Sequence, residues 1–337
     1  MSGGVDSAVS AFLLREQGYD VTGVTLSLYP ENGSSDAEDA ARVAQALGIG
    51  HEVVDLAEAF HSEVIDRFIR AYRNGATPNP CIDCNRYIKF GRMLSYAEGR
   101  QIPWIGTGHY ARIERDTNGR YLLKRAADHT KDQSYVLYSL TQYQLSHTVF
   151  PLGDYKKSEI REIAESQGLI NARKRDSQDI CFVPDGDYAA FIERYTGEVY
   201  PCGDFIDRDG NVLGRHRGMI RYTVGQRKGL GIALGKPAFV CAKSAKDNTV
   251  TIGENADLFS SELYACDFNW IACDAPTSPV RVTAKIRYGQ NETPAAAEVT
   301  DEGRVHVMFD VPQRAIAKGQ SVVLYDGDTV VGGGTIE

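Results

Sequence analysis

The chain has 337 residues, a formal net charge of −8 and 42% hydrophobic residues, which is typical of a soluble protein of two or three globular domains. No segment approaches the roughly 18 consecutive apolar residues of a membrane span, and the start lacks the basic and apolar stretches of a secretion signal. We therefore expect a cytoplasmic protein without membrane contact. Seven cysteines, an odd number in a long chain, argue against a disulfide scaffold and for a reducing compartment.

The first half of the chain alternates amphipathic helices with apolar strands. We expect helices over residues 6–17, 37–47, 57–73 and 85–98, and strands over residues 21–28, 51–55 and 102–107. Strands and helices in alternation predict a Rossmann-like parallel sheet that is covered on both faces, and so an α/β fold.

The pattern changes near residue 175, where helical periodicity fades and glycine becomes frequent. Short strands separated by turn signals follow from about residue 262 to the end, which predicts a C-terminal β-barrel. We therefore expect an α/β domain over residues 1–175, a small central domain over residues 176–258 and the barrel over residues 259–337.

A basic block lies in the expected central domain. Residues 215–246 contain no Asp or Glu and carry eight cations, Arg215, Arg217, Arg221, Arg227, Lys228, Lys236, Lys243 and Lys246. A local block of this kind can hold a phosphate backbone although the whole chain is acidic. A solvated loop region without a partner is the alternative interpretation.

The start of the chain has the character of a phosphate-binding loop. Gly3 and Gly4 let backbone N–H groups approach an anion, and Ser2 and Ser7 add hydroxyl donors just before the first expected helix. The loop lacks the lysine of the Walker motif and suits pyrophosphate. The alternative is a flexible start in which Ser7 or Asp6 merely caps the helix.

A cysteine pair, Cys81 and Cys84, follows two prolines that stiffen residues 77–80. Because Cys84 stands just before the expected helix 85–98, we predict a lowered thiol pKa, with assistance from Lys89. A third cysteine, Cys181, follows the basic run 173–175. Cys81, Cys84 and Cys181 could be ordinary cysteines, ligands of a metal or iron–sulfur cluster, or partners in dithiol chemistry. We interpret Cys202, Cys241, Cys266 and Cys273 as structural.

These motifs together resemble the tRNA-specific 2-thiouridylase family of the PP-loop ATP pyrophosphatase superfamily. The resemblance extends over the whole chain, through residues 2–7, 77–80, 84–85, 88–91, 107–111, 131–135, 176–178, 181–182, 222–227 and 332–336. In that superfamily the loop follows a buried strand, and no such strand stands before Ser2 here. Either the start is displaced or ATP binding is weakened.

The resemblance implies ATP-dependent 2-thiolation of the wobble uridine of tRNAs for Lys, Glu and Gln. ATP, with Mg²⁺, would adenylate the C2 oxygen of the base. Cys181 would carry a persulfide received from a sulfur-relay protein or cysteine desulfurase, and Cys84 would act as the nucleophile that resolves Cys181 through a transient disulfide. The implied ATP-binding residues are Ser2, Gly3, Gly4, Val5, Asp6, Ser7, Leu26 and Gly108.

The same resemblance implies the residues that meet the RNA. Asn79, Pro80 and Cys81 would contact the target base, and the implied tRNA contacts are His109, Lys131, Asp132, Gln133, Arg287, Tyr288 and Gln320. Many members have Asp at position 81, and the extra thiol here keeps open a [4Fe–4S] cluster on Cys81, Cys84 and Cys181. For His109, Asp132 and the Arg287–Tyr288 pair, purely structural roles are the alternatives.

Two other functions remain open at this point. A PP-loop enzyme acting on a small molecule would have no use for the basic block or the barrel. A tRNA-binding protein without catalytic activity would fit the absence of the first strand.

Overall fold

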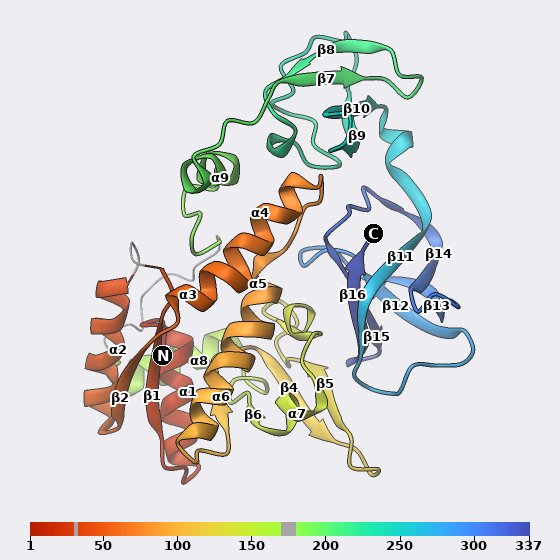
Figure 1. Ribbon diagram of the computed structural model, residues 1–337. Helices are drawn as coiled ribbons and strands as arrows, with labels where there is room; N and C mark the ends of the chain where they lie inside the picture. Colours follow the sequence, from red (N-terminus) through yellow and green to blue (C-terminus); the bar gives the residue numbers. More distant parts are fainter. Residues whose placement is uncertain (30–32, 170–179) are drawn as a thin grey trace.

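The computed structural model describes residues 1–29, 33–169 and 180–337. Figure 1 shows an α/β region at the lower left, a central region of green and teal strands at the top, and a blue barrel at the right. The expected fold class is confirmed. The expected division at residue 175 lies outside the described residues, so the domain limits stay a prediction.

The α/β region contains two pairs of parallel strands. β1 (Thr22–Ser27) pairs with β2 (Gly50–Asp55), and β3 (Ile105–Gly106) pairs with β6 (Thr148–Val149). Within the described residues these pairs are not hydrogen-bonded to each other. Met1 lies along β1, where the Thr25 hydroxyl donates to its carbonyl over 2.8 Å. The loop after Met1 is therefore held beside this strand.

Amphipathic helices cover these strands. α1 (Val5–Glu16) buries Ala8, Val9 and Leu13, and this apolar face packs with side chains of α2 (Gly33–Leu47) and α8 (Lys157–Ser166) in one core. The turn after α1 uses Gly18 at φ +88°, a conformation that glycine adopts without strain.

Two longer helices contain π-helical stretches. The first runs through α3 (Ala57–Phe60), η2 (His61–Ile65) and α4 (Asp66–Arg73). The second runs through α5 (Pro80–Asp83), η3 (Cys84–Arg92) and α6 (Met93–Gly99). In the second, the Met93 N–H group donates to the Ile88 carbonyl five residues back, the spacing of a π-helix. Such stretches are frequent at functional sites.

A hairpin outside the elements expected above joins the α/β region to the barrel. β4 (Ala111–Arg115) and β5 (Tyr121–Arg125) are antiparallel, and Lys124 of β5 pairs with Thr329 of the barrel. η4 (Ser134–Leu137) and α7 (Gln142–Ser146) follow the hairpin. The barrel sheet therefore continues into the first half of the chain.

The central region is a small mixed sheet in the order β8-β7-β10-β9 around buried Phe205, Val240 and Val250. Only the β7–β10 pairing is parallel among those described. Its elements are α9 (Tyr188–Thr196), β7 (Gly203–Ile206), β8 (Val212–His216), η5 (Met219–Arg221), β9 (Phe239–Ser244), β10 (Thr249–Gly253) and η6 (Asn255–Leu258).

The C-terminal strands form the expected barrel, which closes where β11 pairs with both β14 and β16. Its strands are β11 (Phe259–Trp270), β12 (Val280–Lys285), β13 (Thr293–Val299), β14 (Val305–Arg314), β15 (Ser321–Asp326) and β16 (Thr329–Ile336). Val307, Val322 and Leu324 are fully buried inside it. Within the described ranges, no helix is both long and apolar enough to cross a bilayer.

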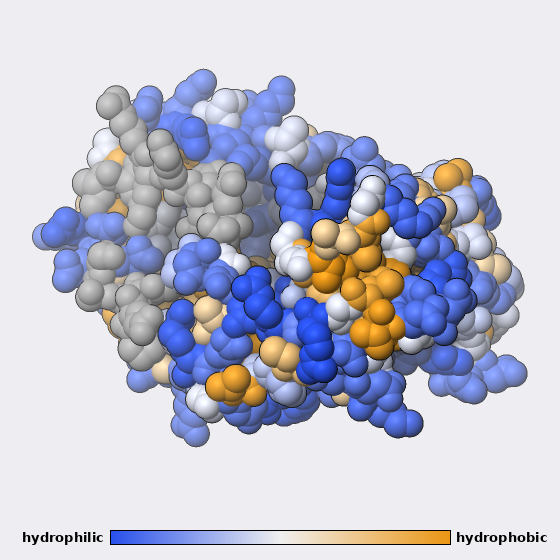
Figure 2. Space-filling model, turned by 90° about the horizontal axis from the view of Figure 1, so that it is seen from above, coloured by the Kyte–Doolittle hydropathy of each residue, from blue (hydrophilic) through white to orange (hydrophobic). Residues whose placement is uncertain are grey.

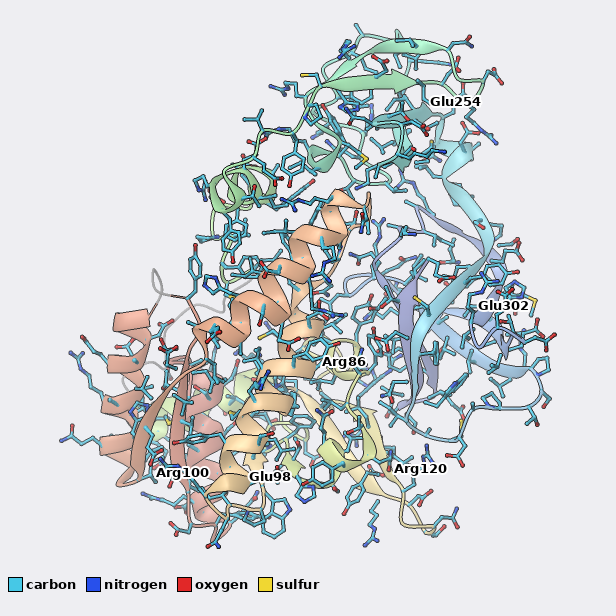
Figure 3. The ribbon with its side chains drawn as sticks, viewed as in Figure 1. Arg86, Glu98, Arg100, Arg120, Glu254 and Glu302 are labelled. Carbon is cyan, nitrogen blue, oxygen red and sulfur yellow. The ribbon has the colours of Figure 1, made fainter. Side chains whose placement is uncertain are left out.

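Arginine side chains fasten the barrel to the α/β region (Figure 3). Arg86, on the second π-containing helix, pairs with Asp267 of β11. Arg120, in the β4–β5 turn, pairs with Asp274 over 2.8 Å and donates to the Ile271 carbonyl over 2.6 Å. Planar guanidinium groups suit such multiple contacts. The helix that carries Cys84 is therefore fixed against the barrel.

Candidate functional site

The loop before α1 has the geometry of an anion cradle. Gly4 is the N-cap in an extended conformation, and Gly3 adopts φ +66°. The Ser7 hydroxyl accepts the Ser2 N–H group over 3.1 Å and donates to the Gly4 carbonyl over 3.0 Å. A side chain at Gly3 would place its Cβ 2.7 Å from the Asp36 carbonyl oxygen. The loop is therefore tightly turned, with the first N–H groups of α1 behind it.

Asp6 has a structural task inside this loop. Its carboxylate accepts the Lys157 ammonium over 2.7 and 2.8 Å and the Tyr110 hydroxyl over 2.8 Å. Lys157 and Tyr110, which sequence reasoning did not single out, thus hold the start of α1 against α8 and the residues after β3. The Asp6 carboxylate is therefore already engaged, and contact of Asp6 with ATP stays a prediction.

Gly108 brings the end of β3 against the phosphate loop. A Cβ at this position would lie 2.9 Å from the Asp6 carbonyl carbon and 3.0 Å from the Ser7 nitrogen. Leu26, at the end of β1, packs against the core cluster that contains Cys84 and Phe182. Gly108 and the loop 2–7 therefore meet just beyond the end of β3, and open α/β sheets bind their ligands at such strand ends. Binding of ATP by these residues stays a prediction.

The helix that carries Cys84 begins five residues earlier than expected. Asn79 caps it by accepting the Cys81 N–H group over 3.1 Å, and Pro80 is its first residue. Cys84 therefore lies inside the helix and is buried. Burial raises its pKa to about 12, which Lys89 opposes. The prediction of a lowered Cys84 pKa was wrong, because loss of water outweighs the nearby positive charge.

The structure brings Cys81, Cys84 and Cys181 together. Cys81 and Cys181 are exposed residues, but neighbouring atoms crowd their sulfurs and raise both pKa values. Each of the three thiols interacts electrostatically with another, and Lys89 lowers the pKa of all three. Phe182 fixes the position next to Cys181 by packing edge-on against Phe60 and Phe68, at 5.7 and 5.3 Å between ring centres.

The three cysteines do not form a preformed metal site. Among the described residues, no group of three or more His, Cys, Asp or Glu side chains is arranged to hold an ion. The basic run 173–175 and the motif 176–178 lie outside the described residues.

His109 is buried between two phenylalanine rings. Its ring centre lies 5.7 Å from that of Phe90 and 5.9 Å from that of Phe150, and the residue is 7% exposed. Burial holds the pKa of His109 well below its usual value, and the charge of Lys89 lowers it further. The ring is therefore neutral at physiological pH, and this packing fits a structural role. Contact with tRNA stays a prediction.

The other implied tRNA contacts fall into two groups. In the first, Asp132 accepts the Ala126 and Ser134 N–H groups, Gln133 accepts the Tyr110 N–H group over 2.9 Å, and Tyr288 donates to the Asp132 carbonyl over 3.2 Å. Lys131, which precedes them, is half-buried. Of this group, Tyr288 is 43% exposed. It is therefore the member best placed to stack on a base.

The second group makes contacts between parts of the protein. Arg287 donates to the Ala315 and Val224 carbonyls over 2.6 and 3.4 Å, and Gln320 donates to the Thr77 carbonyl over 2.6 Å. These polar groups are thus already engaged. Their contact with tRNA stays a prediction.

The raised pKa of Cys84 predicts slow alkylation at neutral pH. A thiol with a pKa of about 12 is ionised to roughly one part in 100,000 at pH 7, and its reactivity should rise about tenfold per pH unit. We expect iodoacetamide to modify exposed Cys202 well before Cys84, as measured by mass spectrometry of peptides. Protein unfolded in urea, where all cysteines react, is the control. Equal rates in the folded protein would contradict the burial of Cys84.

Comparison with known proteins supports, along the whole chain, the family resemblance that the sequence motifs indicate. Family models match residues 1–185 (tRNA methyl transferase HUP domain), 189–254 (tRNA methyl transferase PRC-barrel domain) and 260–336 (aminomethyltransferase beta-barrel domain). The tRNA-specific 2-thiouridylase MnmA of Clostridioides difficile (strain 630) is 50% identical over 350 residues, which cover 100% of this chain and 96% of that protein. The protein of the same name from Clostridium acetobutylicum is 50% identical over 348 residues, covering 100% and 98%. The chain therefore belongs to the MnmA family of tRNA-specific 2-thiouridylases.

Proposed function

We propose that this protein uses ATP to replace the C2 oxygen of the wobble uridine of tRNA by sulfur, in tRNAs for Lys, Glu and Gln. The two relatives described above match this chain over 96% and 98% of their own length, and both are named tRNA-specific 2-thiouridylase. The residues that the proposal needs are present: a phosphate loop, paired thiols and a basic central region.

The position of Gly108–His109 is the main support for the proposal, because this segment contacts both the end of the phosphate loop and the helix that carries Cys84. Gly108 touches the first turn of α1, where the phosphate loop ends. His109 packs against Phe90, which lies on the same helix as Cys84 and Lys89. The proposed nucleotide site and the cysteine helix would therefore lie next to each other, which supports a reaction that activates a base and then sulfurates it.

We propose the following course for the reaction. The C2 oxygen attacks the α-phosphorus of ATP and pyrophosphate leaves, stabilised by the N–H groups of the loop and of α1. The terminal sulfur of a Cys181 persulfide then bonds to C2, and AMP departs with the original oxygen. Cys84 attacks the Cys181 sulfur, which releases the thiolated base and leaves a Cys84–Cys181 disulfide for a thiol reductant to reopen. Because Cys84 is buried with a raised pKa, this last step needs the thiol to be ionised during the cycle.

Mg²⁺ would balance the charge of the phosphates. Asp6, the carboxylate in the loop, is already bonded to Lys157 and Tyr110. The metal would therefore be held mainly by phosphate oxygens, as Mg²⁺ commonly is.

An iron–sulfur variant remains the alternative for sulfur delivery, with Cys81, Cys84 and Cys181 as the ligands. In the described residues these cysteines are not arranged as a metal-binding group. Iron content and visible absorbance of anaerobically purified protein test this variant directly. The persulfide route instead requires a protein partner that donates sulfur.

The central region would hold the tRNA. Of its basic block, Arg215, Arg221 and Lys236 are paired with carboxylates outside the block. Within the described chain no ion pair engages Arg217, Arg227 or Lys228, and all three are open to solvent. Figure 2 shows this end of the molecule from above as hydrophilic residues around an apolar patch. Val212, the first residue of β8 in the central region, is an exposed apolar side chain, at 64%.

Reversing the charges of Arg215 and Arg217 should weaken tRNA binding and flatten its dependence on salt. The slope of log K against log salt becomes shallower by about 1 for each phosphate that the protein no longer neutralises. Fluorescence titration of tRNA over a range of salt concentrations measures this slope. Arg100→Glu, which changes an exposed arginine paired with Glu52 in the α/β region, is the control and should leave the slope unchanged. An unchanged slope in the double variant would place the block away from the RNA.

Nucleoside mass spectrometry tests the function itself. Unmodified tRNA is incubated with the protein, ATP, Mg²⁺ and a persulfide source, and 2-thiouridine is the expected product. Absence of the product together with tight tRNA binding would favour a tRNA-binding protein without catalytic activity. ATP turnover without tRNA binding would favour an enzyme of small molecules.

A further inference from the structure

Ala76 and Thr77, which precede Pro78 and the target-base loop (residues 79–81, the proposed contacts of the target base), are held by three different parts of the chain. Ala76 donates through its N–H group to the Ala71 carbonyl of α4, over 2.9 Å, and accepts the Lys243 ammonium of β9 over 3.3 Å. Thr77 donates to the Lys318 carbonyl over 2.7 Å and accepts the Gln320 amide over 2.6 Å. Every backbone polar group of these two residues therefore has a partner. Two of the four come from the barrel and one from the central region.

Side-chain packing reinforces these bonds. Gly319 adopts φ +85°, and a Cβ there would lie 2.8 Å from the Ala76 Cβ and 3.1 Å from the Thr77 nitrogen. The barrel turn therefore touches the segment at a distance that only glycine permits. Figure 1 shows the upper end of α4 between the barrel and the central strands, where this contact lies.

The Lys243 ammonium loses much of its contact with water where it donates to the Ala76 carbonyl. Its ammonium lies 5.7 Å from the ring centre of Tyr72, which stacks on Tyr188 of α9 at 4.6 Å. Burial lowers the pKa of Lys243 to about 8. A desolvated lysine needs a polar partner, and within the described part of the chain the Ala76 carbonyl is the one that accepts its hydrogen bond. This lysine belongs to the basic block by sequence, but its ammonium points into an internal contact.

We propose that Lys243 and Gln320 are positioning residues, which hold Ala76 and Thr77 and so fix the target-base loop and the cysteine helix to the two regions that would bind tRNA. The inference rests on the proposed function. Pro78 and Pro80 make the following residues stiff, so a displacement at Thr77 passes on to Cys81 and Cys84. RNA bound by the barrel and the central region would thereby be held at a fixed position relative to Cys81 and Cys84.

The sharpest test compares two glycines that share a backbone conformation. Gly319→Ala adds a methyl group against Ala76, whereas Gly303→Ala adds it at φ +76° with no atom within 4 Å. The strain of a positive φ is thus common to both variants, and only Gly319→Ala pushes the segment. We expect Gly319→Ala to lower kcat for thiolation at least about tenfold, because a small misplacement of reacting groups is costly. The KM for tRNA should stay within about twofold, and Gly303→Ala should match the wild type.

Hydrogen exchange provides a readout that does not depend on thiolation. Amides of residues 75–84 should exchange faster in Gly319→Ala, and also in Gln320→Met and Lys243→Met, which remove single hydrogen bonds without adding bulk. Lys243→Arg retains a donor and should restore protection and kcat in part. Thermal unfolding of each variant checks that the fold is kept.

The possible outcomes distinguish a failure of the positioning role from a failure of the proposed function. Unchanged exchange and unchanged kcat in Gly319→Ala and Gln320→Met would overturn the positioning role. A rise in KM for tRNA at constant kcat in Gln320→Met would overturn it too, and would make Gln320 a direct tRNA contact. If the wild type makes no 2-thiouridine, the proposed function fails, and the exchange data alone then decide whether the segment is held as described.

Discussion

Replacing Cys181 by serine should abolish the formation of 2-thiouridine while tRNA affinity stays within about twofold of the wild type. A hydroxyl group cannot carry a transferable sulfur, so no step can replace the lost persulfide. We expect a fall of at least about a thousandfold, the scale on which removal of a nucleophile leaves only residual catalysis. The measurement is nucleoside mass spectrometry over time, with tRNA binding followed in parallel. Full activity would remove Cys181 from the mechanism.

Two further variants complete this test. Cys202→Ser changes another exposed cysteine, in the central region, and should leave the rate unchanged. Cys84→Ser should also stop the reaction, but at a later point, because the Cys181–sulfur–tRNA adduct forms and cannot be resolved. A covalent protein–tRNA species that a thiol reductant releases would mark that point. Release of free 2-thiouridine by Cys84→Ser at the wild-type rate would mean that Cys84 does not resolve the adduct.

Local sequence signals predict the fold class, the helices and strands up to β3, and the strand-rich C-terminal barrel. Apolar periodicity locates α1 and β1 to within about two residues. The start of the cysteine helix is misplaced because two prolines in close succession also indicate a stiff loop. Proline at the first helical position after an asparagine cap is equally a helix start signal. The hairpin β4–β5 carries its own turn signal, Asn118–Gly119 with Gly119 at φ +88°, which the sequence-based prediction overlooked; only the pairing of Lys124 with Thr329, some 200 residues further on, depends on tertiary contacts.

The environment of the site could not be predicted, because contacts distant in sequence create it. The pKa of Cys84 depends on burial by a cluster that includes Phe60 and Phe182. His109 is buried because Phe90 and Phe150 meet around it. Motifs identify the candidate residues, whereas the direction of their pKa shifts and their exposure depend on tertiary packing.

Substituting Gly108 by alanine should weaken ATP binding and slow ATP-dependent thiolation by disturbing the phosphate loop. The new Cβ would lie 2.9 Å from the Asp6 carbonyl carbon and 3.0 Å from the Ser7 nitrogen, and both are backbone atoms in the first turn of α1. Backbone atoms cannot give way as the end of a flexible side chain can, so the loop itself must move. We expect ATP affinity, measured by calorimetry, and the thiolation rate each to fall at least about tenfold. The affinity for tRNA should be kept.

Gly99→Ala is the matched control for this substitution. Gly99 ends α6, its φ is not in the left-handed region, and a Cβ there meets no atom within 4 Å. Neither substitution therefore needs a strained backbone, and only Gly108→Ala creates a clash. We expect Gly99→Ala to keep the ATP affinity and rate of the wild type. If Gly108→Ala binds ATP as tightly as Gly99→Ala does, the nucleotide does not sit on the loop 2–7, and adenylation of the base must take place elsewhere on the protein or not at all.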